Sequence, residues 1–102
     1  MTVKRRVEVT EAARAQILAA SAWWEENRPS APGAVAEELD RILALLVVQP
    51  AMGTPARSAR LREVRRIALT RIRYYVYYRA TDTAVQVLAF WHTSRGKEPP
   101  LQ

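Results

Sequence analysis

Cysteine is absent from this chain of 102 residues, and other residue types that build common active sites are scarce. Without cysteine there is no disulfide, no thiolate zinc site and no cysteine nucleophile. A single histidine, His92, is too few for the familiar protein metal sites. The three glycines, Gly33, Gly53 and Gly96, are scattered and form no phosphate-binding loop. We therefore expect neither a metal nor a cofactor.

Long apolar runs are also lacking. The longest run extends from Ile42 to Val48, far short of the ~20 apolar residues that a membrane span requires. The N-terminus is basic, but no apolar segment follows it, so we expect no secretory signal, no membrane partner and a cytoplasmic location. The length, with 49% apolar and 25% charged residues, is typical of one globular domain.

Lysine is rare, whereas arginine is abundant. Lys4 and Lys97 are the only lysines among 16 basic residues, which face ten acidic ones and leave a formal charge of +6. Arginine pairs in a planar, bidentate manner with carboxylates and phosphates. Many arginines lie between Arg57 and Arg79, while the acids gather on the predicted helices. This distribution favours an acidic protein partner first and a nucleic-acid-bearing target second, with an ordinary solvated surface as the alternative.

The first third of the chain predicts a strand followed by a helix. Val7 and Val9 alternate with charged residues, as in a short strand with one buried face. Thr10 is a suitable N-cap, and the helix that follows must end near Arg28, because Pro29 disfavours helical geometry in the residue before it. The apolar stripe of this helix consists of Ala13, Ile17, Ala20 and Trp24.

A second amphipathic helix follows after a short connection. It begins between Pro32 and Ala34, since proline is tolerated in the first helical turn, and Pro50 stops it. Its apolar stripe consists of Val35, Leu39, Ile42 and Leu46. The short connection predicts that the two helices form an antiparallel hairpin.

After residue 60 the apolar period changes from 3.6 to 2. Strands are predicted from residue 61 to 68, from 71 to 79 and from 84 to 91, with a turn at 81–83. The last strand is nearly all apolar, as in a central strand covered on both faces. The fold class is therefore α+β, in the order β-α-α-β-β-β, with the helical hairpin packed on a small antiparallel sheet and the N-terminal strand beside a later one. We expect one domain over residues 1–92 and an extended or mobile tail over 93–102.

The strand over residues 71–79 presents tyrosines and arginines together. Strand alternation places Tyr75 and Tyr77 on one face with Arg73 and Arg79, and the remaining tyrosines on the other. Such a face suits RNA or an acidic peptide, whereas the plain alternative is core on one side and amphipathic covering on the other. Five more arginines extend the same basic patch in this interpretation: Arg60, Arg62, Arg65, Arg66 and Arg71.

Trp23 and His92 are two further candidates for a functional site. Trp24 belongs to the helical stripe, so its neighbour Trp23 points about 100° away from it. An outward tryptophan marks either a protein contact or packing against the tail or the second helix. His92, at the end of the last strand, is either hydrogen-bonded to backbone or a general acid beside a phosphodiester.

Several segments in order resemble one protein family. These are the helical hairpin, Pro50-x-x-Gly53, Leu61-Arg62, the segment Tyr74–Arg79 and His92-x-x-Arg95. Together they are similar to the RelE/ParE superfamily of toxins from type II toxin–antitoxin modules. The resemblance covers nearly the whole chain. It implies a small basic toxin in a hetero-oligomer with an acidic antitoxin, whose C-terminal segment wraps and neutralises it.

The superfamily contains two activities. RelE-like members are ribosome-dependent mRNA endoribonucleases, and the resemblance then implies catalysis by Arg62, Arg79 and His92, with Glu63 as a base. ParE-like members poison DNA gyrase by binding and need no catalytic residue. This chain has Thr93-Ser94 after His92, no tyrosine near its end and no lysine cluster, unlike many nucleases of the superfamily.

We therefore expect a ParE-like gyrase inhibitor, with the mRNA endoribonuclease and a non-toxic basic binding module as alternatives. Whether the protein is an enzyme depends on this choice. The residues expected to bind the antitoxin or the target are Arg62, Arg65, Arg73, Tyr75, Tyr77, Arg79, Arg95 and Trp23.

Overall fold

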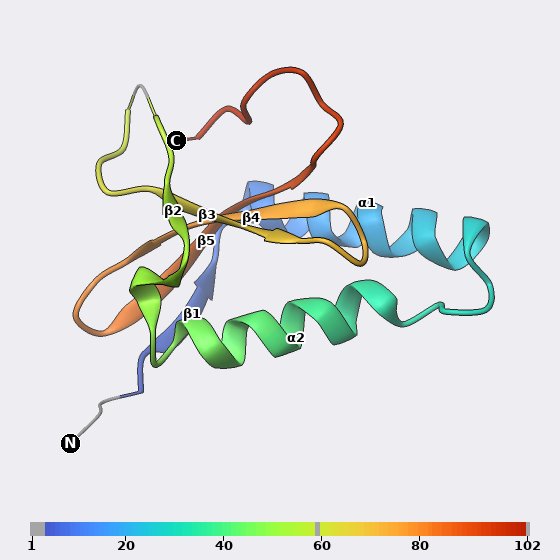
Figure 1. Cartoon of the computed structure of the whole chain (residues 1–102), viewed down its shortest axis with the longest axis horizontal. Coiled ribbons are helices and arrows are strands. Elements are labelled where there is room, and N and C mark those ends of the chain that lie inside the picture. Colours follow the sequence, from blue (N-terminus) through green and yellow to red (C-terminus); the bar gives the residue numbers. More distant parts are fainter. Residues whose placement is uncertain (1–3, 59, 102) are drawn as a thin grey trace.

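Two helices cover one face of a five-stranded sheet in the computed structural model, which describes residues 4–58 and 60–101 (Figure 1). The elements in chain order are β1 (Arg6–Val9), α1 (Glu11–Asn27), α2 (Ala34–Leu46), the short 3₁₀ helix η1 (Pro50–Met52), β2 (Thr54–Pro55), β3 (Arg65–Leu69), β4 (Tyr74–Ala80) and β5 (Ala84–His92). The predicted α+β class is confirmed. No helix in the described part of the chain is long and apolar enough to cross a membrane.

The sheet is mixed, with the strand order β1-β5-β4-β3-β2. β1 joins the sheet beside β5, as expected, but the two run parallel, while the other neighbours are antiparallel. The prediction of a wholly antiparallel sheet is therefore wrong for β1. Both helices lie between β1 and the rest of the sheet in the chain, and such a long connection permits a parallel pair.

Both ends of α1 and the start of α2 agree with the sequence predictions, whereas α2 ends at Leu46, before Pro50. The side chain of Thr10 caps α1 by accepting a hydrogen bond from the backbone N–H of Ala13 at 3.1 Å. The Thr10 hydroxyl also donates to the carbonyl of Leu88 at 3.3 Å, so the cap connects the start of α1 to β5. α1 ends before Arg28, and α2 begins at Ala34, within the predicted range.

Two strands start later than predicted. β3 begins at Arg65 instead of Leu61, and β4 begins at Tyr74 instead of Arg71. Glu63 and Arg73 have φ angles of 59° and 62°, in the left-handed region that a strand does not use. These two residues mark places where the chain turns before entering the sheet.

Apolar side chains fill both sides of the sheet. On the helix side, residues of α1 and α2 pack against Val76, Val85 and Phe90. On the opposite side lies a smaller cluster of Val64, Tyr77, Leu88, Ala89, Trp91 and Leu101. The predicted double covering of β5 is therefore confirmed. The C-terminal segment contributes to this second cluster, because the indole N–H of Trp91 donates to the carbonyl of Lys97 at 2.9 Å and Leu101 is buried.

A β-bulge places two consecutive residues of β5 on the same side of the sheet. Tyr77 opposes Ala89 and Tyr78 opposes Val87, so Leu88 has no residue directly across from it. Leu88 and Ala89 consequently both belong to the cluster away from the helices, which strict alternation would not allow.

Candidate functional site

The tyrosines of β4 divide between the two faces as predicted. Tyr74 and Tyr78 pack with the helix-side cluster, and Tyr75 and Tyr77 with the opposite one. We call the side of the sheet away from the helices the tyrosine face, after Tyr75 and Tyr77. The two rings lie 6.1 Å apart in an edge-to-face arrangement. Tyr77 is buried, so this face is partly core and not wholly a binding surface.

The arginines do not form the single basic patch predicted from the sequence. Arg66 lies on the tyrosine face, where its guanidinium sits 4.3 Å from the ring centre of Tyr75 and donates to the hydroxyl of Tyr77 at 3.2 Å. This hydrogen bond raises the pKa of Arg66. Arg65 points to the opposite side and donates to the carbonyl of Gly53 at 2.7 Å. Adjacent strand residues alternate between faces, so two neighbouring arginines cannot share one.

Arg79 lies on the tyrosine face in a polar row that crosses three strands. Its guanidinium donates to the side-chain oxygen of Gln86 at 3.0 Å, and the amide of Gln86 donates to Glu8 at 3.1 Å. Glu8 also pairs with Arg6 at 2.8 Å. These contacts, first from Gln86 and then from Arg6, hold the pKa of Glu8 below its usual value.

The four residues of the nuclease hypothesis lie at two distant ends of the sheet. His92 opposes Tyr74 at the start of β4, whereas Arg79 opposes Gln86 near its end. Five residues of strand separate these positions, roughly 17 Å at about 3.3 Å per residue. Arg62 and Glu63 precede β3, whose first residue opposes Tyr78, so they lie toward the Arg79 end.

His92 itself is hydrogen-bonded locally. Its Nδ1 accepts from the backbone N–H of Ser94 at 3.1 Å and lies 2.6 Å from the Ser94 hydroxyl. The backbone-bonded role at a strand end, one of the two expected for this residue, is therefore present. The ring also meets Tyr74 edge to face at 5.1 Å between centroids.

Four of the predicted site residues do come together, around a pocket of about 640 Å³. This pocket lies where the end of α1 meets the turn before β4 and the segment after β5. We call it the Trp–Arg pocket, lined by Trp23, Trp24, Arg28, Arg71, Ile72, Arg73, Tyr74, His92, Ser94 and Arg95. Its lining includes four arginines and several aromatic residues and no acidic residue.

Several side chains of the Trp–Arg pocket are fixed by contacts outside it. Arg71 donates to Glu37 of α2 at 3.0 Å and lies 3.5 Å from Glu38. The ring of Tyr74 stacks on Phe90 with 4.6 Å between centroids. Burial raises the pKa of Tyr74, and the nearby charge of Arg95 opposes this shift.

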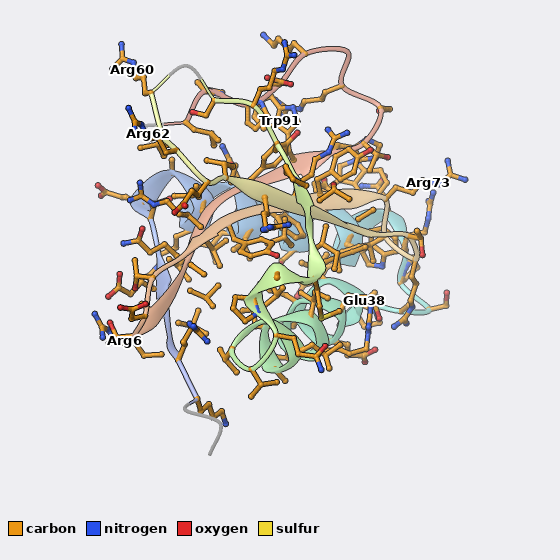
Figure 2. All side chains as sticks on the ribbon, turned by 60° about the vertical axis from the view of Figure 1, so that its left-hand side comes forward. Arg6, Glu38, Arg60, Arg62, Arg73 and Trp91 are labelled. Atoms are coloured by element: carbon orange, nitrogen blue, oxygen red, sulfur yellow. The ribbon has the colours of Figure 1, made fainter. Side chains whose placement is uncertain are left out.

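The two ends of the sheet therefore carry separate groups of arginines. Figure 2 shows Arg60 and Arg62 on one side of the molecule and Arg73 on the other. Sequence reasoning selected Trp23, Arg73, His92 and Arg95 individually but missed Trp24, Arg28 and Tyr74 as their neighbours. No local pattern would have found this set, because its three segments meet only when the hairpin packs on the sheet.

Comparison with known proteins identifies the family. The family model described as the ParE toxin of the type II toxin–antitoxin system, parDE, matches residues 7–96. A comparison with curated proteins gives no match. A solved structure described as the chromosomal ParDE TA system from P. aeruginosa has the same fold, with a TM-score of 0.68, 18% identity, and coverage of 89% of this chain and 98% of that one. The chain therefore belongs to the ParE toxin family of type II toxin–antitoxin systems.

Proposed function

We propose that this ParE-family toxin inhibits DNA gyrase by binding it, without cleaving nucleic acid. The observation that carries the proposal is the distance between His92 and the group formed by Arg62, Glu63 and Arg79, at opposite ends of the sheet. General acid–base cleavage requires the acid and the base to flank one scissile bond within hydrogen-bonding reach. Membership of the ParE family supports the same choice of target.

We further propose that a cognate acidic antitoxin, of the ParD kind, covers and neutralises this toxin. The toxin carries a formal charge of +6, and an acidic partner would complement this positive charge. Exposed apolar side chains lie on β1 and near the end of α2, and the segments that flank them are joined by the hydrogen bond from the Arg5 N–H to the Val47 carbonyl. We call this set of residues the β1–α2 seam: Val7, Val9, Leu45 and Val48.

The direct test has two parts. The toxin is induced in cells without an antitoxin, and the purified toxin is added to gyrase and to translating ribosomes. We expect arrested growth, loss of supercoiling by purified gyrase, and intact mRNA on translating ribosomes. The variant H92A should retain gyrase inhibition, because the proposed inhibition depends on binding and His92 is not among the residues expected to bind the target. Gyrase left unaffected while ribosome-bound mRNA is cut would establish the endoribonuclease activity instead. Unchanged growth on induction, with the folded protein present, would favour a non-toxic binding module.

A further inference from the structure

The Trp–Arg pocket has the electrostatic character of an anion site. Within the described residues, Arg28, Arg73 and Arg95 have no carboxylate within ion-pair distance, and only Arg71 is paired. Four smaller hollows of the surface each include a glutamate in their lining, so positive charge there is partly balanced. Arginines without an ionic partner that line one cavity attract a ligand with more than one negative charge, and of these the Arg95 guanidinium also lies 3.9 Å from the ring centre of Trp91.

The hydrogen-bonding groups of the Trp–Arg pocket are mostly donors. A guanidinium offers only N–H groups, and an indole offers one N–H and no acceptor. The Nε1 of Trp24 is buried and has no partner within the protein. A buried donor without a partner is costly, and Trp24 thus adds an unsatisfied donor to a pocket lining that is already rich in donors. The ligand group should therefore be rich in acceptors, like the oxygens of a phosphate.

The same pocket also has an aromatic wall. Trp23 is 48% exposed at its rim, an unusual position for a tryptophan in a small protein, and the guanidinium of Arg28 lies 5.4 Å from its ring centre. Planar groups such as nucleobases stack on tryptophan rings and on arginine planes. The volume of about 640 Å³ is in the range of pockets that hold small molecules.

We propose that the Trp–Arg pocket binds a nucleoside phosphate, with the phosphate held by Arg73 and Arg95 and the base stacked on Trp23. A single carboxylate would satisfy one guanidinium and leave the aromatic wall unused, whereas a nucleotide uses both features. The nucleotide can be free or can be one unit of a single-stranded nucleic acid, because both present the same phosphate and base. No cleavage is part of this inference, and it is independent of the gyrase target.

The test is calorimetric titration of the purified full chain with adenosine 5′-monophosphate. We expect saturable binding, and at least tenfold weaker binding of inorganic phosphate and of adenosine tested separately. Arg73→Asn should weaken binding of the nucleotide at least tenfold, and asparagine tolerates the left-handed backbone at this position. The matched control is Arg60→Asn, an exposed arginine on the other side of the molecule, which should change the affinity less than twofold (Figure 2).

A second pair of variants tests the aromatic wall. Trp23→Ala should weaken binding of the nucleotide at least tenfold, whereas Leu18→Ala, an exposed apolar residue on the same helix, should leave it unchanged. Thermal unfolding of each variant establishes that the protein remains folded. At least tenfold tighter binding of a thymidylate hexamer than of the mononucleotide would identify nucleic acid as the source, and equal affinity would identify a free nucleotide.

Three results would overturn the proposal. The first is that the nucleotide does not bind saturably. The second is equal weakening of binding by the Arg73 and Arg60 variants, which would reveal only general attraction between charges. The third is that a glutamate hexapeptide binds with an affinity that depends on Arg73 while the nucleotide does not bind, which would make the pocket a contact for acidic protein. Because the titration contains no gyrase, its failure is distinguishable from failure of the proposed target.

Discussion

At the scale of single residues, the motif Pro50-x-x-Gly53 has a structural explanation. The Tyr78 hydroxyl donates to the carbonyl of Pro50 at 2.6 Å and accepts from the N–H of Gly53 at 2.8 Å. Burial raises the pKa of Tyr78, although the hydrogen bond from Gly53 opposes the shift. Through these hydrogen bonds the motif holds the segment after α2 against β4. Its presence alone is therefore no evidence for a particular target.

Gly53→Ala is expected to destabilise the protein. A Cβ atom at this position would lie 2.6 Å from the Tyr78 hydroxyl and 2.8 Å from the backbone carbonyl oxygen of Arg66, so the sheet would have to shift. Overpacking of this kind costs about 1–3 kcal/mol in free energy of unfolding. Urea denaturation measures the loss. Gly96→Ala is the control, because open space surrounds that position; an equal loss in both variants would contradict the explanation.

Tyr78→Phe tests the hydroxyl itself. The substitution leaves the Pro50 carbonyl and the Gly53 N–H without their buried partner, and we expect a loss of about 2 kcal/mol in free energy of unfolding. Tyr75→Phe is the matched control on the same strand, because the contacts of Tyr75 in the described part of the chain are made by its ring, which phenylalanine keeps. A stability within 0.5 kcal/mol of wild type for the Tyr78 variant would show that these bonds contribute little, since changes of about this size are ordinary for surface positions.

At the scale of elements, α2 is connected to the turn before β4 by charge. Glu38 is the one buried charged residue of the described chain, and it accepts from Arg41 at 3.1 Å while lying 3.5 Å from Arg71. The Arg41 hydrogen bond, aided by Arg71, holds the pKa of Glu38 below 4.5 despite the opposing effect of burial. Because Arg71 also lines the Trp–Arg pocket, this ion pair positions part of the pocket.

Glu38→Gln should remove an acid-sensitive part of the stability. A carboxyl with a lowered pKa in the folded state contributes stability that is complete above the unfolded value of 4.5 and is lost as pH falls through the folded value. We expect the variant to be about 1 kcal/mol less stable at pH 7, and the difference to vanish in strong acid. Thermal unfolding from pH 7 to pH 2.5 measures it. A constant difference across this range would contradict the role of the charge, and Glu26→Gln, exposed on α1, is the control.

At the scale of the whole molecule, local patterns predicted the elements and long-range pairing did not follow from them. The cap at Thr10, the end of α1 near Arg28 and the division of the β4 tyrosines each depend on a few neighbouring residues, and all are confirmed. The parallel pairing of β1, the short strand β2 and the Trp–Arg pocket depend on segments far apart in the chain. Strand alternation separates Arg65 from Arg66, whereas the count of charges along the chain predicts one basic surface for both.

The distribution of charge and apolar surface leads to a final prediction about neutralisation. With arginines on both faces and an apolar β1–α2 seam, the proposed antitoxin should bind through two separable contributions. Raising salt from 0.05 to 0.5 M should weaken its affinity by about tenfold, because screening reduces the ionic contribution and leaves apolar burial intact. The double variant V7S/V48S should bind more weakly at every salt concentration with the same salt dependence. R62A/R79A should instead reduce the salt dependence.

Surface plasmon resonance with the antitoxin immobilised measures the affinity and its salt dependence, and Leu18→Ser is the control outside the seam. An affinity that does not change with salt would exclude an ionic contribution to antitoxin binding and would leave the arginines available to another partner.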